Sequence, residues 1–226
     1  MLPRVRVDAT SRHTATIVWL HGLGASGYDF EPIVPMLDLP EVRFVFPHAP
    51  ERAVTVNGGL ELPAWYDVTS LDFGDDRAAA GDIAESAAEI ATILRAELDA
   101  GISSERLVLV GFSQGAAMAL HVALRFDQPL AGVACLSGYL LQRRETASQI
   151  HEANRSIPIL CCHGKLDDLI PSELGKETYD FLQAKTKSRD IRWEEFPIGH
   201  EVSPEEIEVI AAWLRERLPP EDDSFA

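Results

Sequence analysis

The stretch VLVGFSQGAAMAL, residues 108–120, decides the fold prediction because it changes character in its middle. An apolar run rich in valine and leucine, typical of a buried strand, gives way to alanines that favour a helix. At the change stand Gly111, Ser113 and Gly115, although glycine and serine neither pack well nor favour extended backbone. This G-x-S-x-G pattern indicates a sharp strand-to-helix turn that holds its serine in a strained conformation at a helix N-terminus.

The same alternation of apolar runs and helical patterns extends over most of the chain. Runs dense in Val, Ile and Leu are typical of strands covered on both faces of a parallel sheet. The sequence therefore predicts an α/β fold with a mostly parallel central sheet flanked by helices. Ser172 and Ser203, each beside a proline, are expected to cap the last two helices. We expect strands at 15–21, 42–47, 106–112, 130–137, 157–163 and 191–196, and helices at about 76–98, 114–125, 172–186 and 204–217.

One domain accounts for the whole pattern. A chain of 226 residues, 46% of them hydrophobic, is long enough to bury a single sizeable core. We expect this domain to span 1–218 and to be followed by a disordered acidic tail at 219–226. The segment 51–73 interrupts the alternation with Asn57-Gly58-Gly59 between short β-prone runs. This predicts a hairpin that is too small to be a cap domain.

The charge balance restricts the partners. The chain has 36 acidic and 20 basic residues, a net charge of −16, and such a surface repels nucleic-acid phosphates and anionic lipid headgroups. We therefore expect neither a nucleic-acid partner nor stable membrane anchoring. The acidity is consistent with solubility, and adaptation to a high-salt habitat is the alternative.

Cysteine usage and the terminal segments indicate a cellular compartment. The three cysteines lie inside apolar stretches without C-x-x-C spacing, which indicates reduced core thiols. The N-terminal sequence shows no apolar leader, and no run approaches 18 consecutive apolar residues. These features predict a cytoplasmic protein.

A reactive Ser113 needs partners, because a hydroxyl is a weak nucleophile unless a base takes its proton and a carboxylate orients that base. Asp167 and Asp168 follow the predicted strand 157–163, and His200 follows the next strand. Parallel strands bring these side chains to one edge of the sheet, and the chain order serine, acid, histidine is typical of this turn. Spacing alone leaves Asp167 and Asp168 as alternatives for the acid.

The loop HGLGASG, residues 21–27, follows the first long strand and contains G-x-G-x-x-G, which is also a dinucleotide-binding pattern. That pattern requires a helix at once, but here prolines interrupt YDFEPIVPML. The loop is better interpreted as one side of an oxyanion hole formed by the amides of Leu23 and Gln114, with His21 as a structural residue. A dinucleotide-binding oxidoreductase and a binding module without turnover are the alternatives from other functional classes.

Six ordered motifs resemble the phospholipase/carboxylesterase family of α/β-hydrolases, which includes bacterial carboxylesterases and acyl-protein thioesterases. The resemblance covers nearly the whole chain, through HGLGASGYDF, PHAPERAVTVNGG, LPAWYD, GFSQGAAMAL, HGKLDDLIP and GHEV. The family pattern H-G-x-x-D-x-x-V-P aligns its catalytic acid with Asp167, with Ile170 in place of valine, and its G-H with Gly199-His200. Ala116 and Lys165 depart from the family pattern. The resemblance also implies an acyl pocket lined by Leu62, Trp65, Leu71, Tyr139 and Leu169.

The residues and the resemblance together imply a serine hydrolase that cleaves small carboxylic esters, with short to medium acyl chains favoured, through an acyl-enzyme. An acyl-protein thioesterase or a lysophospholipase is the alternative. We expect no metal or organic cofactor, because His163, Asp167 and Asp168 lack a defined ligand spacing. An exposed apolar rim around the acyl groove would suit a homodimer.

Overall fold

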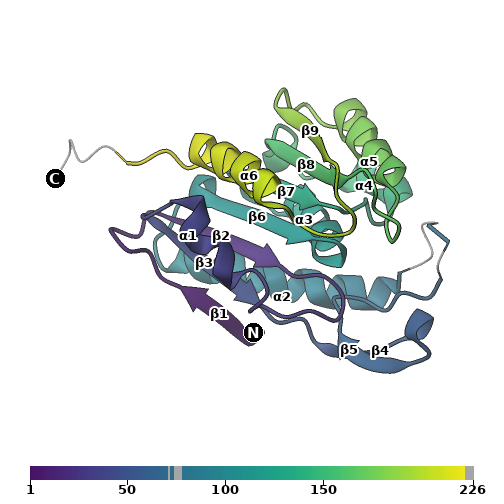
Figure 1. The fold of residues 1–226 in the computed structure, drawn as a ribbon. Coiled ribbons are helices and arrows are strands. Elements are labelled where there is room, and N and C mark those ends of the chain that lie inside the picture. The colour runs from purple at the N-terminus through teal and green to yellow at the C-terminus, as the bar shows by residue number, and fades with distance from the viewer. Residues whose placement is uncertain (71, 74–77, 222–226) are drawn as a thin grey trace.

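A seven-stranded, mostly parallel sheet forms the centre of the computed structural model, which describes residues 1–70, 72–73 and 78–221 (Figure 1). The strand order is β1-β3-β2-β6-β7-β8-β9, and only the edge strand β1 runs antiparallel to its neighbour. This arrangement confirms the predicted fold class. The strands are Arg4–Val7 (β1), Ala15–Leu20 (β2), Val42–Pro47 (β3), Leu107–Phe112 (β6), Gly132–Leu136 (β7), Ile159–Gly164 (β8) and Ile191–Phe196 (β9).

Helices cover both faces of the sheet, and successive strand residues alternate between two hydrophobic clusters. Val18 and Leu20 of β2 belong to the cluster under α2 and α3, whereas Ile17 and Trp19 belong to the cluster under α1 and α6. The central strands are therefore buried on both faces, as their continuous apolar runs predict. The helices are Val34–Leu37 (α1), Ala80–Asp99 (α2), Gln114–Arg125 (α3), Arg143–Gln149 (α4), Ser172–Lys185 (α5) and Pro204–Arg217 (α6).

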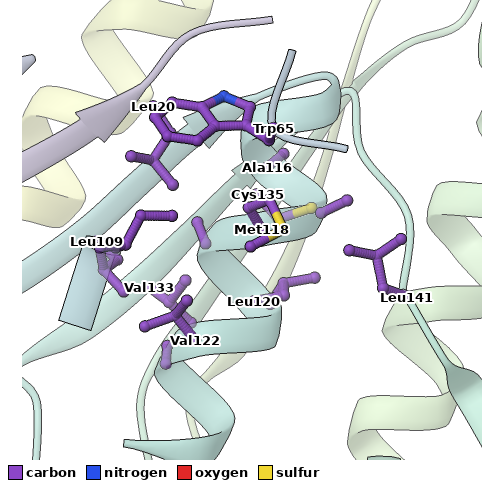
Figure 2. Close-up of a cluster of buried hydrophobic side chains, with 14 of the residues drawn as sticks. Leu20, Trp65, Leu109, Ala116, Met118, Leu120, Val122, Val133, Cys135 and Leu141 are labelled. Carbon is purple, nitrogen blue, oxygen red and sulfur yellow. The ribbon is translucent and has the colours of Figure 1, made fainter. Parts of the chain in front are cut away.

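Helix α3 lies within the core, and all its residues from Gln114 to Leu124 are buried. Figure 2 shows Met118 and Leu120 of this helix among Leu109 of β6, Val133 and Cys135 of β7 and other apolar side chains. The alanines of the helix keep its backbone close to the sheet because their side chains are small. The residue that precedes this helix is therefore fixed by the best-packed part of the molecule.

The predicted hairpin is present as a separate two-stranded antiparallel sheet, Glu51–Val54 (β4) paired with Leu60–Pro63 (β5). Gly58 and Gly59 in its turn have φ values of 70° and 78°, which are accessible to glycine without strain. Arg52 of β4 donates hydrogen bonds to Asp82 and Glu85 of α2, and Figure 1 shows the hairpin beside that helix. The hairpin is thus held against the body of the protein.

Some local predictions differ from the structure. Ser203 caps α6 by accepting a hydrogen bond from the Glu206 amide, but Ser172 is the first residue of α5 and makes no cap. The short elements β1, α1 and α4 were not predicted. Residues 222–226 of the expected tail lie outside the described residues, while Pro219 accepts a hydrogen bond from Arg106 through its carbonyl oxygen.

All three cysteines are buried and free of disulfides, as predicted. No helix in the described ranges is long and apolar enough to cross a bilayer. Within the same ranges, no group of three His, Cys, Asp or Glu side chains is arranged to hold a metal ion.

Candidate active site

Ser113 stands at the turn between β6 and α3 with φ 57° and ψ −121°, a backbone conformation that is costly for any residue with a side chain. The flanking glycines allow this turn. A Cβ atom on Gly111 would overlap the Gly115 carbonyl group, and one on Gly115 would overlap the carbonyl oxygens of Leu20 and His21 in the chain beside it. The G-x-S-x-G spacing therefore follows from close backbone packing on both sides of the serine.

The structure brings Ser113, His200 and Asp167 into one hydrogen-bonded chain. The Nε2 atom of His200 lies 2.8 Å from Ser113 Oγ, and its Nδ1 atom lies 2.7 Å from Asp167 Oδ2. The imidazole ring also packs on Phe112, with 4.8 Å between the ring centroids. His200 is thus oriented to take the serine proton through Nε2 while its Nδ1–H is held by the carboxylate.

The position of the acid, which spacing left open, is occupied by Asp167, because Asp168 is exposed and Asp167 is buried. Its Oδ1 atom accepts hydrogen bonds from the amides of Leu169 and Ile170, at 3.0 and 2.8 Å. These bonds fix the carboxylate so that its second oxygen faces His200. The loop after β8 therefore holds the acid through its own backbone.

A second histidine supports this loop. His163 of β8 is buried and donates a hydrogen bond from Nε2 to the Ile170 carbonyl oxygen at 2.8 Å, and the same Nε2 lies 3.5 Å from Asp167 Oδ2. Burial lowers the pKa of His163, although the nearby carboxylate opposes this shift. Burial thus favours the neutral imidazole, and its hydrogen bond to Ile170 holds the loop that carries the acid. Sequence analysis did not find this role.

The amides of Leu23 and Gln114 border the same cavity as Ser113. Neither amide donates a hydrogen bond to another of the described residues, so both are available to a ligand. A pair of such donors stabilises the oxyanion of a tetrahedral intermediate, each by about 3 to 4 kcal/mol. His21, expected to be structural, accepts a hydrogen bond from the Ala49 amide and donates one to the Gly22 carbonyl oxygen.

A cavity of about 380 Å³ opens beside Ser113. Tyr139 and Leu169 line it as expected, and Leu71 lies outside the described residues. Trp65 and Leu62 are corrections, since neither contributes to the lining. Trp65 is fully buried in the hydrophobic core, and Leu62 of the hairpin packs against that core. Sequence analysis missed several lining residues, because a motif does not show which of its side chains face a cavity. Four of them lie within the motifs quoted above, and Val68 lies outside these motifs: Asp29, Phe30, Val56, Phe112 and Val68.

Comparison with known proteins places this geometry in a family. A sequence profile described as Phospholipase/Carboxylesterase matches residues 4–218. The chain belongs to the phospholipase/carboxylesterase family. As a member of this family it is an α/β-hydrolase, and the dinucleotide-binding interpretation of the glycine loop is abandoned.

Individual members of the phospholipase/carboxylesterase family resemble the chain over nearly its full length. Acyl-protein thioesterase 1 of Gibberella zeae is 36% identical, with 95% of each chain covered, and that of Yarrowia lipolytica is 34% identical, with 96% of this chain and 97% of the relative covered. The crystal structure of Zea mays acyl-protein thioesterase 2 superposes with a TM-score of 0.86 at 33% identity and covers 96% of this chain and 100% of the other.

Proposed function

We propose that this protein is a serine hydrolase that removes acyl groups from thioesters, with S-acylated cysteine side chains of proteins as its substrate class. The observation that carries the proposal is the position of His200, hydrogen-bonded to both Ser113 and Asp167 at the mouth of a largely apolar cavity. The names of the similar proteins favour a thioester over the oxygen ester that the sequence alone suggested. Hydrolysis of a thioester and hydrolysis of an oxygen ester would use the same nucleophile, base and acid.

The proposed reaction has two halves. Neutral His200 takes the proton of Ser113 Oγ as that oxygen attacks the carbonyl carbon of the thioester, and the amides of Leu23 and Gln114 stabilise the oxyanion. When the tetrahedral intermediate collapses, the carbon–sulfur bond breaks and His200 gives its proton to the leaving sulfur. Water then attacks the acyl-enzyme with His200 as the base, which releases the carboxylic acid and restores Ser113.

The cavity supplies the acyl site in this proposal. Its apolar lining includes Val56, Val68 and Ile170, together with Tyr139 and the exposed side chain of Leu169. A hydrocarbon chain placed there loses contact with water, and each buried methylene contributes about 0.8 kcal/mol. Longer chains should therefore bind more tightly until the cavity is filled.

The test is the hydrolysis of matched thioesters and oxygen esters over a ladder of acyl chains from acetyl to palmitoyl, with Ser113→Ala as the control. We expect kcat/KM to be higher for thioesters, to rise with chain length, and to disappear in the variant. A preference for short oxygen esters would instead identify a general carboxylesterase. Equal hydrolysis by Ser113→Ala would contradict the serine mechanism.

A further inference from the structure

Trp65, which follows β5, holds three separate parts of the molecule together. Its indole Nε1–H donates a hydrogen bond to the His21 carbonyl oxygen at 2.8 Å, and its backbone amide donates to Gln114 Oε1 at 2.7 Å. Its carbonyl oxygen accepts a hydrogen bond from Ser86 Oγ of α2. Figure 2 shows the indole ring beside Leu20, at the end of β2, and near Ala116 of α3. The side chain is fully buried.

The two loops that Trp65 joins carry the two halves of the oxyanion hole. On one side, the Gln114 side chain is held at both ends, because its Nε2 also donates to the Tyr66 carbonyl oxygen at 2.7 Å. On the other side, His21 lies two residues before Leu23, whose amide is the second donor. Pro63, at the end of β5, also contacts the loop with Leu23, because its carbonyl oxygen accepts a hydrogen bond from the Gly24 amide.

The loop with Leu23 needs such external support. Its Gly22 and Gly24 have no side chains to pack, and glycine has more backbone freedom than any other residue. An oxyanion hole is effective only when its donors are already placed where the charge develops. The spacing between the Leu23 and Gln114 amides therefore depends on a residue that contacts both loops and is itself fixed by burial.

We propose that Trp65 is a positioning residue that sets the distance between the Leu23 and Gln114 amides, and this rests on the proposed function. Its indole N–H holds the glycine loop and its backbone amide holds the Gln114 side chain, while Ser86 anchors it to α2. The adjacent Tyr66 reaches the cavity wall, where its hydroxyl lies 2.8 Å from that of Tyr139. The segment that follows β5 thus connects the wall of the cavity with the oxyanion hole.

The test removes the indole N–H. Trp65→Phe keeps an aromatic ring without the donor, and site-specific Trp65→β-(3-benzothienyl)alanine replaces N–H by sulfur in a ring of nearly the same size, so that the fold keeps its packing. The matched control is Trp213→Phe in α6, on the other face of the sheet. Trp213 is equally buried, and its indole N–H has no hydrogen-bond partner among the described residues.

We expect both Trp65 variants to lower kcat by about 10-fold or more with KM changed less than about 2-fold, because the lost interaction acts on the transition state. The affinity for a trifluoromethyl ketone, which forms a tetrahedral oxyanion with Ser113, should fall by the same factor as kcat/KM. The pH profile should not move, since the hydrogen bonds of His200 are untouched. Trp213→Phe should lose thermal stability and keep kcat.

Two results would overturn the proposal: an unchanged kcat in the benzothienyl variant, or equal losses of kcat in the Trp65 and Trp213 variants. Failure of the proposed function would be recognised separately, as a wild-type protein that hydrolyses no acyl substrate. In that case the rate of Ser113 modification by a fluorophosphonate still tests the positioning role, because its P=O oxygen occupies the oxyanion hole. That rate should fall in the Trp65 variants and stay unchanged in the control.

Discussion

At the scale of single residues, the backbone of Ser113 combines reactivity with strain. Its φ of 57° and ψ of −121° suit glycine and cost a residue with a side chain roughly 1 to 3 kcal/mol. The fold tolerates this cost because β6 and α3 are both buried on either side of the turn. The catalytic geometry is therefore obtained at the expense of stability.

We predict that Ser113→Gly is more stable than Ser113→Ala by about 1 kcal/mol. Glycine relieves the strained turn, and this gain exceeds the entropy that glycine adds to the unfolded chain. Both variants lack the nucleophile, so their activities do not complicate the comparison. Urea unfolding of the two proteins measures the difference, and a more stable alanine variant would show that the turn is unstrained.

We predict that kcat/KM falls on acidification with a slope that corresponds to a single proton. Protonated His200 cannot accept the proton of Ser113 Oγ. Burial lowers the pKa of the neighbouring His163 and His21, so each of them should bind a proton only at a lower pH than an ordinary histidine. A pH profile for the hydrolysis of one ester tests this, and a slope of two protons would implicate a second histidine.

At the scale of elements, the periodicity of the sequence predicted the sheet and the long helices well. Helix α3 begins and ends where expected, because a glycine-flanked serine and a polar arginine mark its limits. The edge strand β1 escaped prediction because its alternation covers only four residues, with exposed arginines and half-buried valines. Ser172 failed as a cap because Pro171 already takes the position before the helix.

The site was predicted where chemistry dictates residue type and was missed where packing decides. The chain order serine, acid, histidine selects Ser113 and His200 but leaves two aspartates open, and the family resemblance favours Asp167. The structure joins these three side chains by hydrogen bonds. The placement of Trp65 depends instead on hydrogen bonds from its indole N–H to His21 and from its backbone amide to Gln114, which are 44 and 49 residues away in the chain. No local sequence pattern predicts such long-range contacts.

We predict that Glu206, in the first turn of α6, makes the protein less stable as the pH rises. Burial raises the pKa of Glu206 to about 8, and the Ser203 amide beside it only partly offsets this shift. An unfolded chain releases this proton near pH 4.3, so between about pH 4.3 and 8 the folded state binds the extra proton and stability falls with increasing pH.

Glu206→Gln removes this titration and keeps a side chain that suits the capped helix start. Its advantage over the wild type in free energy of unfolding should grow by a few kcal/mol, as an order of magnitude, from pH 5 to pH 8.5. Urea titrations at the two pH values measure the change. A difference that is independent of pH would show that Glu206 ionises normally in the folded protein.

At the scale of the whole molecule, the net charge of −16 destabilises the folded state, because its acidic side chains repel one another. Surface ion pairs such as Arg95–Asp127 act in the opposite direction, but exposed pairs contribute only about 0 to 1 kcal/mol each. The 36 acidic residues outnumber the 20 basic ones, so acidic groups remain in excess after every possible pairing. Its effect should therefore exceed that of the individual pairs.

We predict that the melting temperature rises by a few degrees when sodium chloride is increased from about 0.01 to 0.5 M, because salt screens the repulsion over this range. Differential scanning calorimetry measures this shift, with equal osmolarities of sucrose as the control for excluded volume. A falling melting temperature would mean that ion pairs dominate. A continued rise above about 1 M, where screening is complete, would support adaptation to high salt.

The burial of α3 has a consequence for the lifetime of the working enzyme. Ser113 is joined to a helix whose residues are buried up to Leu124, so this turn cannot fray while the rest of the molecule stays intact. Its backbone amides should belong to the group that exchanges with deuterium most slowly. Heat inactivation and global melting should accordingly coincide, and an inactive protein that still retains its native core should not accumulate on warming.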